Sequence, residues 1–407
     1  MVVRPAAGGM KEHVLALSAG LAEAGHRIEM AAPHASGVAQ SAREAGLTVY
    51  EIPLVGELNP LSDPRAIAAL RRVIRAGSFD VIHAHGFKAG LVARLGARLS
   101  GSRSGRTPVV VTAHNHVLFR EDTPRSTKSR YRAVERALSG LVARYIAVSQ
   151  SIARELTQAY GLPAEKVTVV YNGVDPAPFS APQDRAASRA ELGLPRPDVV
   201  VGLAARFSAQ KGLRHLVAAV PALRKALTAD GRELLVAIGG SGPLESELRE
   251  QAAAIEASGT IRWLGHVESM PRFLSALDVY VSPAETEALG IGLIEAAIAG
   301  VPTVATDVGG VSEVIVDGET GVLVAPRDPS GLADAVLGVL RDPEGASAMA
   351  VAARARCLLK FAPGLMIERT LGVYAEVLAE IGAASPAVDA SAARPNAGGS
   401  DVADPHA

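Results

Sequence analysis

The chain has 407 residues but few aromatic residues, a single cysteine and no long apolar run. The lone Cys357 excludes an internal disulfide and a cysteine-based metal cluster, so a reducing cytoplasm is the expected location. No stretch of about 18 or more apolar residues occurs, so no helix is expected to span a membrane. The first residues hold a charge, prolines and glycines instead of the apolar segment of a signal peptide.

Charge is balanced overall but divided unevenly along the chain. The net charge is −1, yet residues 1–174 carry 22 basic and 13 acidic residues, and the remainder carries 19 and 29. A basic first half indicates contact with anionic partners such as phosphates, lipid headgroups or an acidic polymer. Solvated arginine surfaces would give the same balance. Nucleic acid is not among the expected partners.

Short apolar, β-branched runs alternate with amphipathic helical patterns, with about six runs in each half. This alternation predicts an α/β fold, with parallel sheets covered by helices on both faces. Two doubly wound domains facing a cleft are favoured over one very wide sheet. The expected segments are a first domain over 1–174, a linker over 175–197, a second domain over 198–362, a long helix over 363–384 and a disordered tail over 385–407.

Doubly wound sheets bind ligands beyond the carboxyl ends of their strands. In the first half, these positions hold Gly8, Gly9, His83, His85, His114, His116, Ser149, Asn172 and Gly173. Only Val2 and Val3 precede the glycine turn, so the first strand is expected to be very short or truncated. His114 directly follows a strand, where it would orient a hydroxyl or serve as a structural residue. No metal site is expected at His83 and His85, because no cysteine or carboxylate stands at ligand spacing.

In the second half, "ARFSAQKG" places Arg206 and Lys211 between a strand and a helix. The two cations would converge on phosphates, or they would form an ordinary surface pair. "AIGGSGPLE" is a glycine-rich turn whose backbone N–H groups at Gly240 and Gly242 suit an anion. It lacks the spacing of a dinucleotide fingerprint.

"SPAETEALGIGLIEAAIAG" sets two carboxylates in an otherwise apolar segment. Glu287 precedes a helix expected to start near Gly292, and Glu295 lies about one turn inside it. Carboxylates for hydroxyl groups and a helix N-terminus for phosphate together form a surface suited to a nucleotide sugar. The alternative is a capping role for Glu287 and a surface position for Glu295.

Taken together, these motifs resemble the retaining glycosyltransferases of the GT-B fold, family four. Glu287 and Glu295 match the family's E-x7-E pattern, and "ARFSAQKG", "GGSGP", "VYNGVD" and "GVPTVATDVGGVSEVIVDGETGVLV" follow the family's order. The resemblance implies two Rossmann-like domains and a final helix that returns to the first. The sequence departs from the family at Ala288 and Leu289, where the family usually has glycine and an aromatic residue.

The resemblance also implies residue roles. Arg206 and Lys211 would neutralise the donor diphosphate, so neither a bound metal nor a tightly bound cofactor is expected. Glu287 would contact the transferred sugar and Glu295 the ribose. The remaining implied contacts are His114 beside the reacting sugar, Gly9, Gly240, Gly242, Leu289, Gly290 and Ile291 around the donor, and Asn172, Ser149 and His85 on the acceptor side.

The expected reaction moves a hexose-type sugar from a UDP- or GDP-sugar to a hydroxyl acceptor with retention of configuration. The departing diphosphate would help to deprotonate the incoming hydroxyl. A lipid-linked or cell-envelope glycan is the expected acceptor, with an anionic membrane surface as a further partner. Basic residues support this expectation at Arg94, Arg98, Arg103, Arg106, Arg120, Arg125, Lys128, Arg130, Arg132 and Arg136. The alternatives are a non-catalytic or partner-dependent sugar-nucleotide-binding protein and a UDP-sugar epimerase.

Overall fold

The computed structural model describes residues 1–382 except 7, 57–58, 60, 102–106, 119–122, 182, 195–197 and 257–258. The expected tail over 385–407 therefore lies outside the described residues, as do Arg103, Arg106 and Arg120.

Two parallel sheets organise the chain, which confirms the predicted α/β fold. The first sheet has seven strands in the order β3-β2-β1-β4-β5-β6-β7. They are β1 (Val2–Val3), β2 (Glu29–Ala32), β3 (Thr48–Glu51), β4 (Ile82–His85), β5 (Val109–Ala113), β6 (Arg144–Ala147) and β7 (Val167–Val169). The second has six in the order β10-β9-β8-β11-β12-β13. They are β8 (Val199–Ala204), β9 (Leu234–Gly239), β10 (Ile261–Gly265), β11 (Val279–Ser282), β12 (Thr303–Thr306) and β13 (Val322–Val324).

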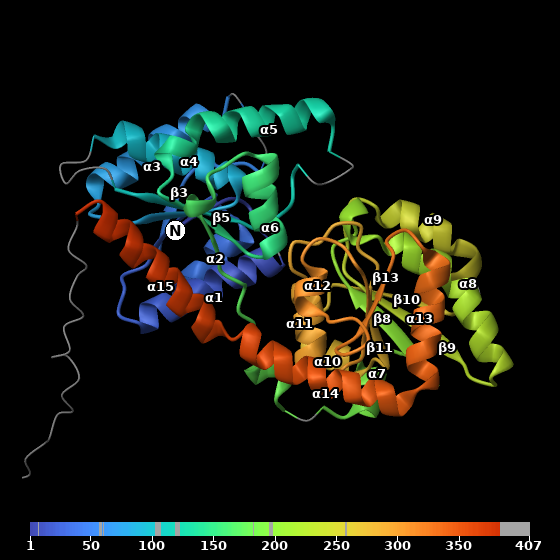
Figure 1. Cartoon of the computed structure of the whole chain (residues 1–407). Coiled ribbons are helices and arrows are strands. Elements are labelled where there is room, and N and C mark those ends of the chain that lie inside the picture. Colours follow the sequence, from blue (N-terminus) through green and yellow to red (C-terminus); the bar gives the residue numbers. More distant parts are fainter. Residues whose placement is uncertain are drawn as a thin grey trace, which may run out of the picture.

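Helices cover the sheets and form two lobes (Figure 1). The first lobe is built on β1–β7, with α1 (Gly9–Glu23), α2 (Gly37–Glu44), α3 (Asp63–Ala76), α4 (Phe87–Ser100), α5 (Arg125–Leu138), α6 (Gln150–Arg154) and α15 (Pro363–Glu380). The second lobe is built on β8–β13, with α7 (Arg185–Glu191), α8 (Leu213–Ala229), α9 (Glu245–Glu256), α10 (Met270–Ser275), α11 (Ile291–Ile298), α12 (Val311–Val314), α13 (Pro329–Arg341) and α14 (Pro343–Lys360).

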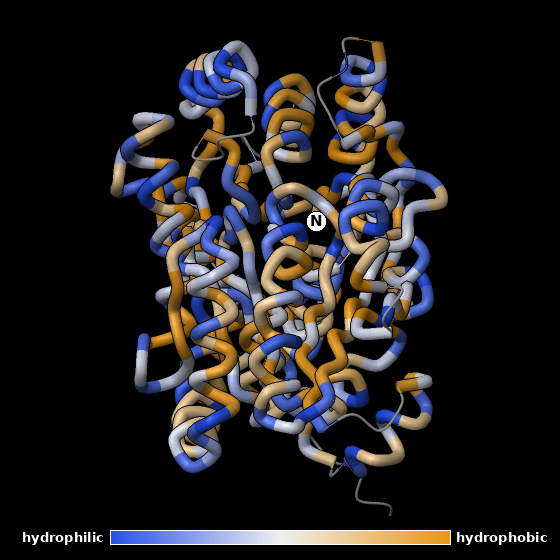
Figure 2. Tube along the Cα trace, turned by 90° about the vertical axis from the view of Figure 1, so that its right-hand side faces the viewer, coloured by the Kyte–Doolittle hydropathy of each residue, from blue (hydrophilic) through white to orange (hydrophobic). Residues whose placement is uncertain are grey.

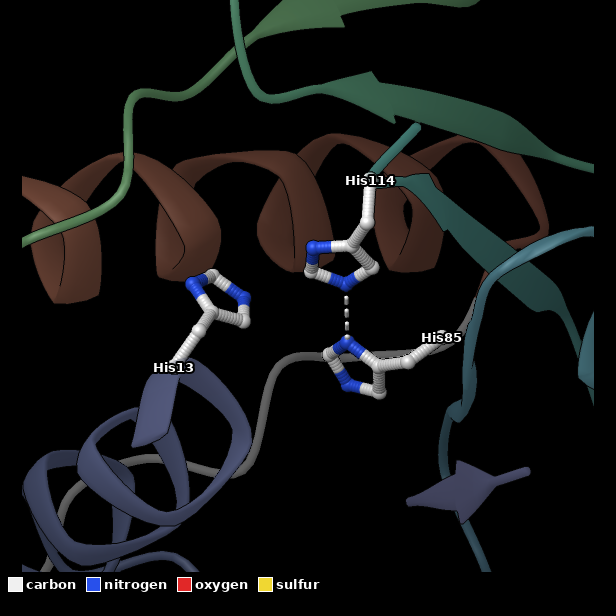
Figure 3. Close-up of side chains that lie close together, drawn as sticks. All are labelled: His13, His85 and His114. Atoms are coloured by element: carbon white, nitrogen blue, oxygen red, sulfur yellow. Dashed lines mark hydrogen bonds between the residues drawn. The ribbon is translucent and has the colours of Figure 1, made fainter. Parts of the chain in front are cut away.

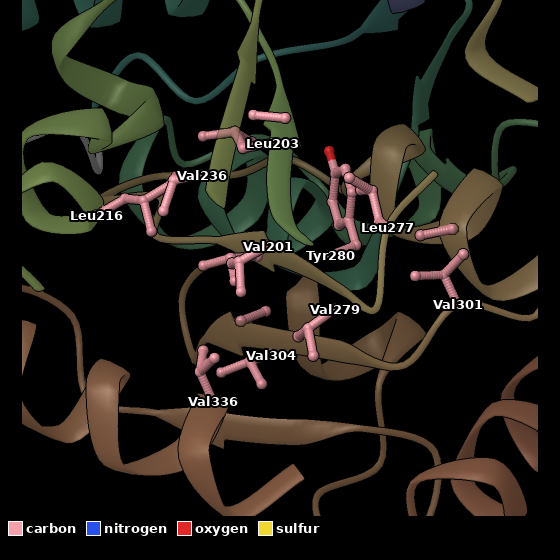
Figure 4. Packing of buried hydrophobic residues seen from close by; sticks show 14 of the residues in the cluster. Val201, Leu203, Leu216, Val236, Leu277, Val279, Tyr280, Val301, Val304 and Val336 are labelled. Atoms are coloured by element: carbon pink, nitrogen blue, oxygen red, sulfur yellow. The ribbon is translucent and has the colours of Figure 1, made fainter. Parts of the chain in front are cut away.

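The apolar runs of the sequence become the buried strands. In the second lobe, Val201, Val236 and Val304 are fully buried between helices on both faces, as Figure 4 shows. The helices alternate polar and apolar segments along the tube in Figure 2, as expected when one face of a helix packs on a sheet. Residues of α8 follow this pattern, with Leu216, Val220 and similar side chains buried.

Strand β1 is two residues long, yet it pairs with β2 on one side and β4 on the other. The short strand is therefore an internal strand of the first sheet, with a neighbour on each side. The strand order reverses direction between β1 and β4, and again between β8 and β11 in the second sheet. Such switch points are where open α/β sheets bind ligands, so they predict the position of the site in each lobe.

The chain passes between the lobes at two adjacent places. The N–H of Val174 donates to the carbonyl of Phe361 at 2.9 Å, and the rings of Tyr171 and Phe361 meet edge to face. Beyond this point α15 packs against α1, with Met366, Val373 and Val377 in one apolar cluster. In Figure 1, α15 lies along the first lobe although it follows the second in sequence.

Candidate active site

Two loops of the second lobe bring Lys211 and Glu287 together. Gly212 has a φ of 61°, and a Cβ there would lie 1.9 Å from the carbonyl oxygen of Pro283. Only glycine fits this left-handed, close contact without strain. The loop after β8 is thereby held against the loop after β11. The Nζ of Lys211 then lies 2.5 Å from Oε2 of Glu287, with the Lys211 side chain one-third exposed.

The ion pair links Lys211 and Glu287, whose implied roles are otherwise separate. The family resemblance implies that Lys211 contacts the diphosphate and Glu287 the sugar, with no contact between the two side chains. Because they pair directly, Glu287 also orients the lysine toward the same space. An anion that binds beside Lys211 would meet a cation that is already positioned. The carboxylate of Glu287, one hydrogen bond away, would face hydroxyl groups of the same ligand.

Arg206 lies on the same edge of the second sheet, two residues after β8. Its loop is held by two glycines, because a Cβ on Gly240 would lie 2.0 Å from the oxygen of Ala205 and one on Gly242 would lie 2.4 Å from the oxygen of Phe207. Arg206 is exposed, and no carboxylate pairs with it among the described residues. The structure thus leaves this guanidinium available to an external anion.

Two helix N-termini meet across the cleft. A Cβ on Gly9, the first residue of α1, would lie 2.6 Å from Cδ1 of Ile291, the first residue of α11. Gly290 precedes α11 with a φ of 95° and provides no side-chain cap. Leu289 is buried in the core, so it offers only its backbone to a ligand. The partial positive charges of both helices therefore favour an anion at this place.

Glu295 lies in the second turn of α11 and is the most perturbed carboxylate of the site. Burial, with a smaller contribution from the charge of Glu12, raises the pKa of Glu295 to about 7. Glu12 belongs to the first turn of α1, so this coupling crosses between the lobes. The sequence did not reveal Glu12, because the contact depends on how the lobes face each other. A half-buried carboxylate at this position is a suitable acceptor for hydroxyl groups of a ligand.

On the first lobe, His114 and His85 form part of a buried histidine cluster (Figure 3). Nδ1 of His85 and Nε2 of His114 are 3.1 Å apart. Their third neighbour, His13 of α1, was not predicted, because a histidine on the buried face of a helix gives no distinct signal. Both ring nitrogens of His13 are buried with no hydrogen-bond partner in the described structure. Burial lowers the pKa of His13 to about 4, so the ring is neutral at pH 7.

Three neutral imidazoles are a possible metal site, since their ligand atoms lie within 4.8 Å of one another. Zinc–nitrogen bonds of about 2.0–2.1 Å would require nitrogens about 3.4 Å apart in a tetrahedral site. Burial lowers the pKa of His114, with smaller contributions from the charges of His13, His83 and Arg4, and the charge of Arg4 would also repel a cation. The charge of Arg4 weighs against a bound cation at this cluster, and the absence of a metal site stays a prediction.

The other acceptor-side predictions have different outcomes. Ser149 is fully buried, and its Oγ accepts the N–H of Ile152 at 3.1 Å as the N-cap of α6. The structure thus gives this hydroxyl a structural contact. Asn172 is also buried, and its Oδ1 has no hydrogen-bond partner within the described structure, so its place on the acceptor side stays a prediction.

Glu313 of the second lobe was not predicted as a functional residue. Its carboxylate accepts the N–H groups of Gln150 and Ser151 at 2.8 and 2.9 Å, at the N-terminus of α6. Its carbonyl oxygen also accepts from Lys360 at 2.7 Å. Glu313 therefore joins the two lobes beside the cleft.

The predicted basic surface needs one correction. Arg94 is not exposed, since its Nη2 donates to Oε2 of Glu135 at 2.8 Å and its side chain is fully buried. Its charge stabilises the interior of the first lobe. Exposed basic residues do occur on α5, at Arg125, Arg130, Arg132 and Arg136. Among the described helices, none is both long and apolar enough to cross a membrane.

Comparison with known proteins places this geometry in a family. Residues 7–178 match the family described as Glycosyltransferase Family 4, and residues 184–356 match Glycosyl transferases group 1. The glycogen synthase of Mycobacterium tuberculosis is 32% identical over 396 residues, covering 90% of this chain and 91% of that protein. The D-inositol 3-phosphate glycosyltransferase of Nocardia farcinica is 31% identical over 418 residues, covering 96% and 89%.

Solved structures show the same architecture. The structure of Anabaena Alr3699/HepE in complex with UDP-glucose superposes with a TM-score of 0.78 at 20% identity, covering 93% of this chain and 99% of that one. WaaG, a glycosyltransferase involved in lipopolysaccharide biosynthesis, superposes with a TM-score of 0.71 at 17% identity, covering 92% and 99%. The chain belongs to glycosyltransferase family 4 and has the GT-B fold, with two Rossmann-like lobes facing a cleft.

Proposed function

We propose that the chain is a retaining glycosyltransferase that moves a hexose-type sugar from a UDP- or GDP-sugar to a hydroxyl acceptor. The observation that carries this proposal is the Lys211–Glu287 pair beside Gly290 at the start of α11, where the N-termini of α1 and α11 meet. Arg206 lies on the same edge of the second sheet, two residues after β8. Negative charge develops on the diphosphate as the sugar leaves. Fixed cations and helix N-termini stabilise that charge at the moment it forms.

The donor would lie mainly on the second lobe. Its diphosphate would contact Arg206, Lys211 and the backbone of Gly290 and Ile291, with Gly9 approaching from the first lobe. Glu295 would accept hydrogen bonds from the ribose and Glu287 from the sugar. The UDP-glucose complex of the Anabaena protein supports a nucleotide sugar as the donor class.

The acceptor would enter from the first lobe, beside His114 and His85. There the departing diphosphate, on the same face of the sugar, would accept the proton of the attacking hydroxyl. No bound metal is required in this scheme, because Arg206 and Lys211 supply the positive charge.

A lipid-linked or cell-envelope glycan remains our proposed acceptor. The exposed arginines of α5 support association with an anionic membrane surface that would carry it. The named relatives include a glycogen synthase and a D-inositol 3-phosphate glycosyltransferase. Membership of the family therefore leaves the acceptor open.

The test is release of nucleoside diphosphate from a panel of UDP- and GDP-sugars. Arg206→Ala and Lys211→Ala should each reduce kcat/KM by about 100-fold or more, as expected for groups that stabilise transition-state charge. Arg341→Ala is the matched control. Arg341 is an exposed residue of α13 that pairs with Asp230, and neither residue belongs to the proposed site. Equal release by the wild type and both cleft variants would refute the proposal.

A further inference from the structure

Glu313 of α12 is bonded to both lobes. Its backbone carbonyl accepts from Nζ of Lys360 at 2.7 Å, within the second lobe. Its carboxylate extends to the first lobe, where it accepts the N–H groups of Gln150 and Ser151 at 2.8 and 2.9 Å. These residues begin α6, and the N-terminus of a helix stabilises a nearby negative charge. One side chain thus fastens the first lobe to a residue whose backbone is fixed in the second.

Tyr171 provides a further donor to the same carboxylate. It lies after β7, close to the place where the chain passes from the first lobe to the second. Burial raises the pKa of the Tyr171 phenol to about 12, and both the charge of Glu313 and a hydrogen bond to its side chain contribute. Backbone and phenol donors of the first lobe therefore converge on Glu313.

The loop between β12 and α12 lies between the backbone of Glu287 and the first lobe. The N–H of Gly310 donates to the carbonyl of Glu287 at 3.0 Å. Gly309 has a φ of 58°, and a Cβ there would overlap the same carbonyl oxygen and lie 3.2 Å from Nε2 of His116. Only glycine fits so close an approach without strain. The backbone that carries Glu287 therefore packs against His116 of the first lobe through this loop.

His116 joins this loop to the helix start that Glu313 binds. Nε2 of His116 lies 3.3 Å from Oγ of Ser151, whose N–H donates to Glu313. Nδ1 of His116 is hydrogen-bonded to the carboxylate of Glu155, which fixes the orientation of the ring. The side chains of His116, Ser151 and Glu155 are all buried. The contact of Glu313 with α6 and the contact of His116 with Gly309 therefore belong to one buried junction.

We propose that Glu313 is a positioning residue for sugar transfer, which aligns His114 on the acceptor side with Glu287 on the donor side. His116 follows His114 by two residues in the loop after β5. The carbonyl of Glu287 is held by Gly310, which directly precedes α12. Both sides of the reacting sugar are therefore connected to the junction at α6. The inference rests on the proposed function, and it assigns Glu313 no contact with either substrate.

The main test is Glu313→Gln, which removes the charge and replaces one acceptor oxygen with an amide nitrogen. The kcat of nucleoside diphosphate release from UDP- and GDP-sugars should fall by about tenfold or more, as loss of a charged hydrogen bond requires. The KM for the donor and the affinity for UDP should stay close to the wild-type values, because Arg206 and Lys211 are unchanged. A residue that only stabilised the fold would not separate kcat from KM in this way.

Gln150→Pro removes one of the donors from the opposite lobe. Proline is favoured at the first residue of a helix, and Ser149 before it is already extended, with φ −158° and ψ 163°. The helix should therefore form, and kcat should fall as in Glu313→Gln. The double variant should be no less active than the less active single variant, since both changes break the same contact.

Asp184→Asn is the matched control. Asp184 likewise accepts two backbone N–H groups, those of Ala186 and Ala187 at the N-terminus of α7, but this contact lies within the second lobe. The control should keep the wild-type kcat. Small-angle X-ray scattering measures the alignment of the lobes without turnover. The radius of gyration should increase in Glu313→Gln and Gln150→Pro and stay unchanged in Asp184→Asn.

Three results would overturn the inference. One is a wild-type kcat in both Glu313→Gln and Gln150→Pro, and another is an equal radius of gyration in all four proteins. The third is a loss of activity in Glu313→Gln that Gln150→Pro does not share, because Glu313 would then act within the second lobe. A wild type that releases no nucleoside diphosphate from any donor would instead refute the proposed function, and the role of Glu313 in transfer with it.

Discussion

Glu295 gives a prediction whose size follows from its environment. An exposed glutamate has a pKa of 4.5, and burial of Glu295 raises this to about 7. The folded protein thus holds a carboxyl group that resists ionisation. Below pH 4.5 the group is protonated in both states and has no effect. Between pH 4.5 and 7 the unfolded chain ionises first, so stability falls, and above pH 7 the full cost is present.

The magnitude is about 3.5 kcal/mol, from about 1.4 kcal/mol for each pH unit between the two pKa values. Glu295→Gln removes the carboxylate but keeps its shape. The variant should therefore melt at a temperature several degrees above the wild type at pH 8 and at the same temperature near pH 4.5. Thermal melts from pH 4.5 to 8.5 measure this difference. Glu319→Gln, at an exposed position outside the cleft, is the control and should show no such trend.

The same carboxylate should make nucleotide binding pH-dependent. In the proposed function, ionised Glu295 accepts hydrogen bonds from the ribose, so the affinity for UDP should rise with pH until about pH 7 and then level off. The phosphate groups of UDP also titrate in this pH range. Because Glu295→Gln lacks the carboxylate, the pH dependence of its UDP affinity measures the titration of UDP alone. The reasoning is refuted if Glu295→Gln is less stable than the wild type at pH 8, or if both proteins share one pH profile for UDP.

Two further predictions concern the scaffold of the site. Arg94→Met should lower the free energy of unfolding by about 3–5 kcal/mol in denaturant melts, because Glu135 would remain buried without its partner. The double variant Arg94→Met with Glu135→Met should recover much of this loss. A single variant as stable as the wild type would show that the pair is not desolvated. Gly212→Ala should reduce nucleoside diphosphate release strongly, because a Cβ would overlap the carbonyl of Pro283 and displace Lys211, whereas Gly338→Ala on α13 has open space and should be neutral. Normal activity of Gly212→Ala would contradict the role of this loop contact.

The sequence was sufficient to predict the fold, because apolar β-branched runs and amphipathic helices depend on local spacing. It also indicated that Glu287 and Arg206 lie at strand ends. It did not reveal the pairing of Lys211 with Glu287, since these residues are 76 positions apart and meet only through two loops. Arg94 was misplaced for the same reason, because its partner Glu135 is 41 positions away.

Other omissions have different physical causes. Ser149 stands directly before a helix, and the N-cap contact that the structure shows there is a pattern that the sequence also allows. Its place on the acceptor side stays a prediction. Glu12 gains significance only from Glu295 across the cleft. His13 gains it from His85 and His114 on other elements of its own lobe, and no local pattern encodes either contact.

The central claim is that a nucleoside diphosphate binds between Arg206, Lys211 and the two helix N-termini. Calorimetric titration of the wild type, each single alanine variant and the double variant with UDP and GDP tests it most directly. The account predicts that at least one of the two nucleotides binds, that each substitution weakens its binding by about tenfold or more, and that the double variant binds more weakly still. Equal affinity in all four proteins would contradict it.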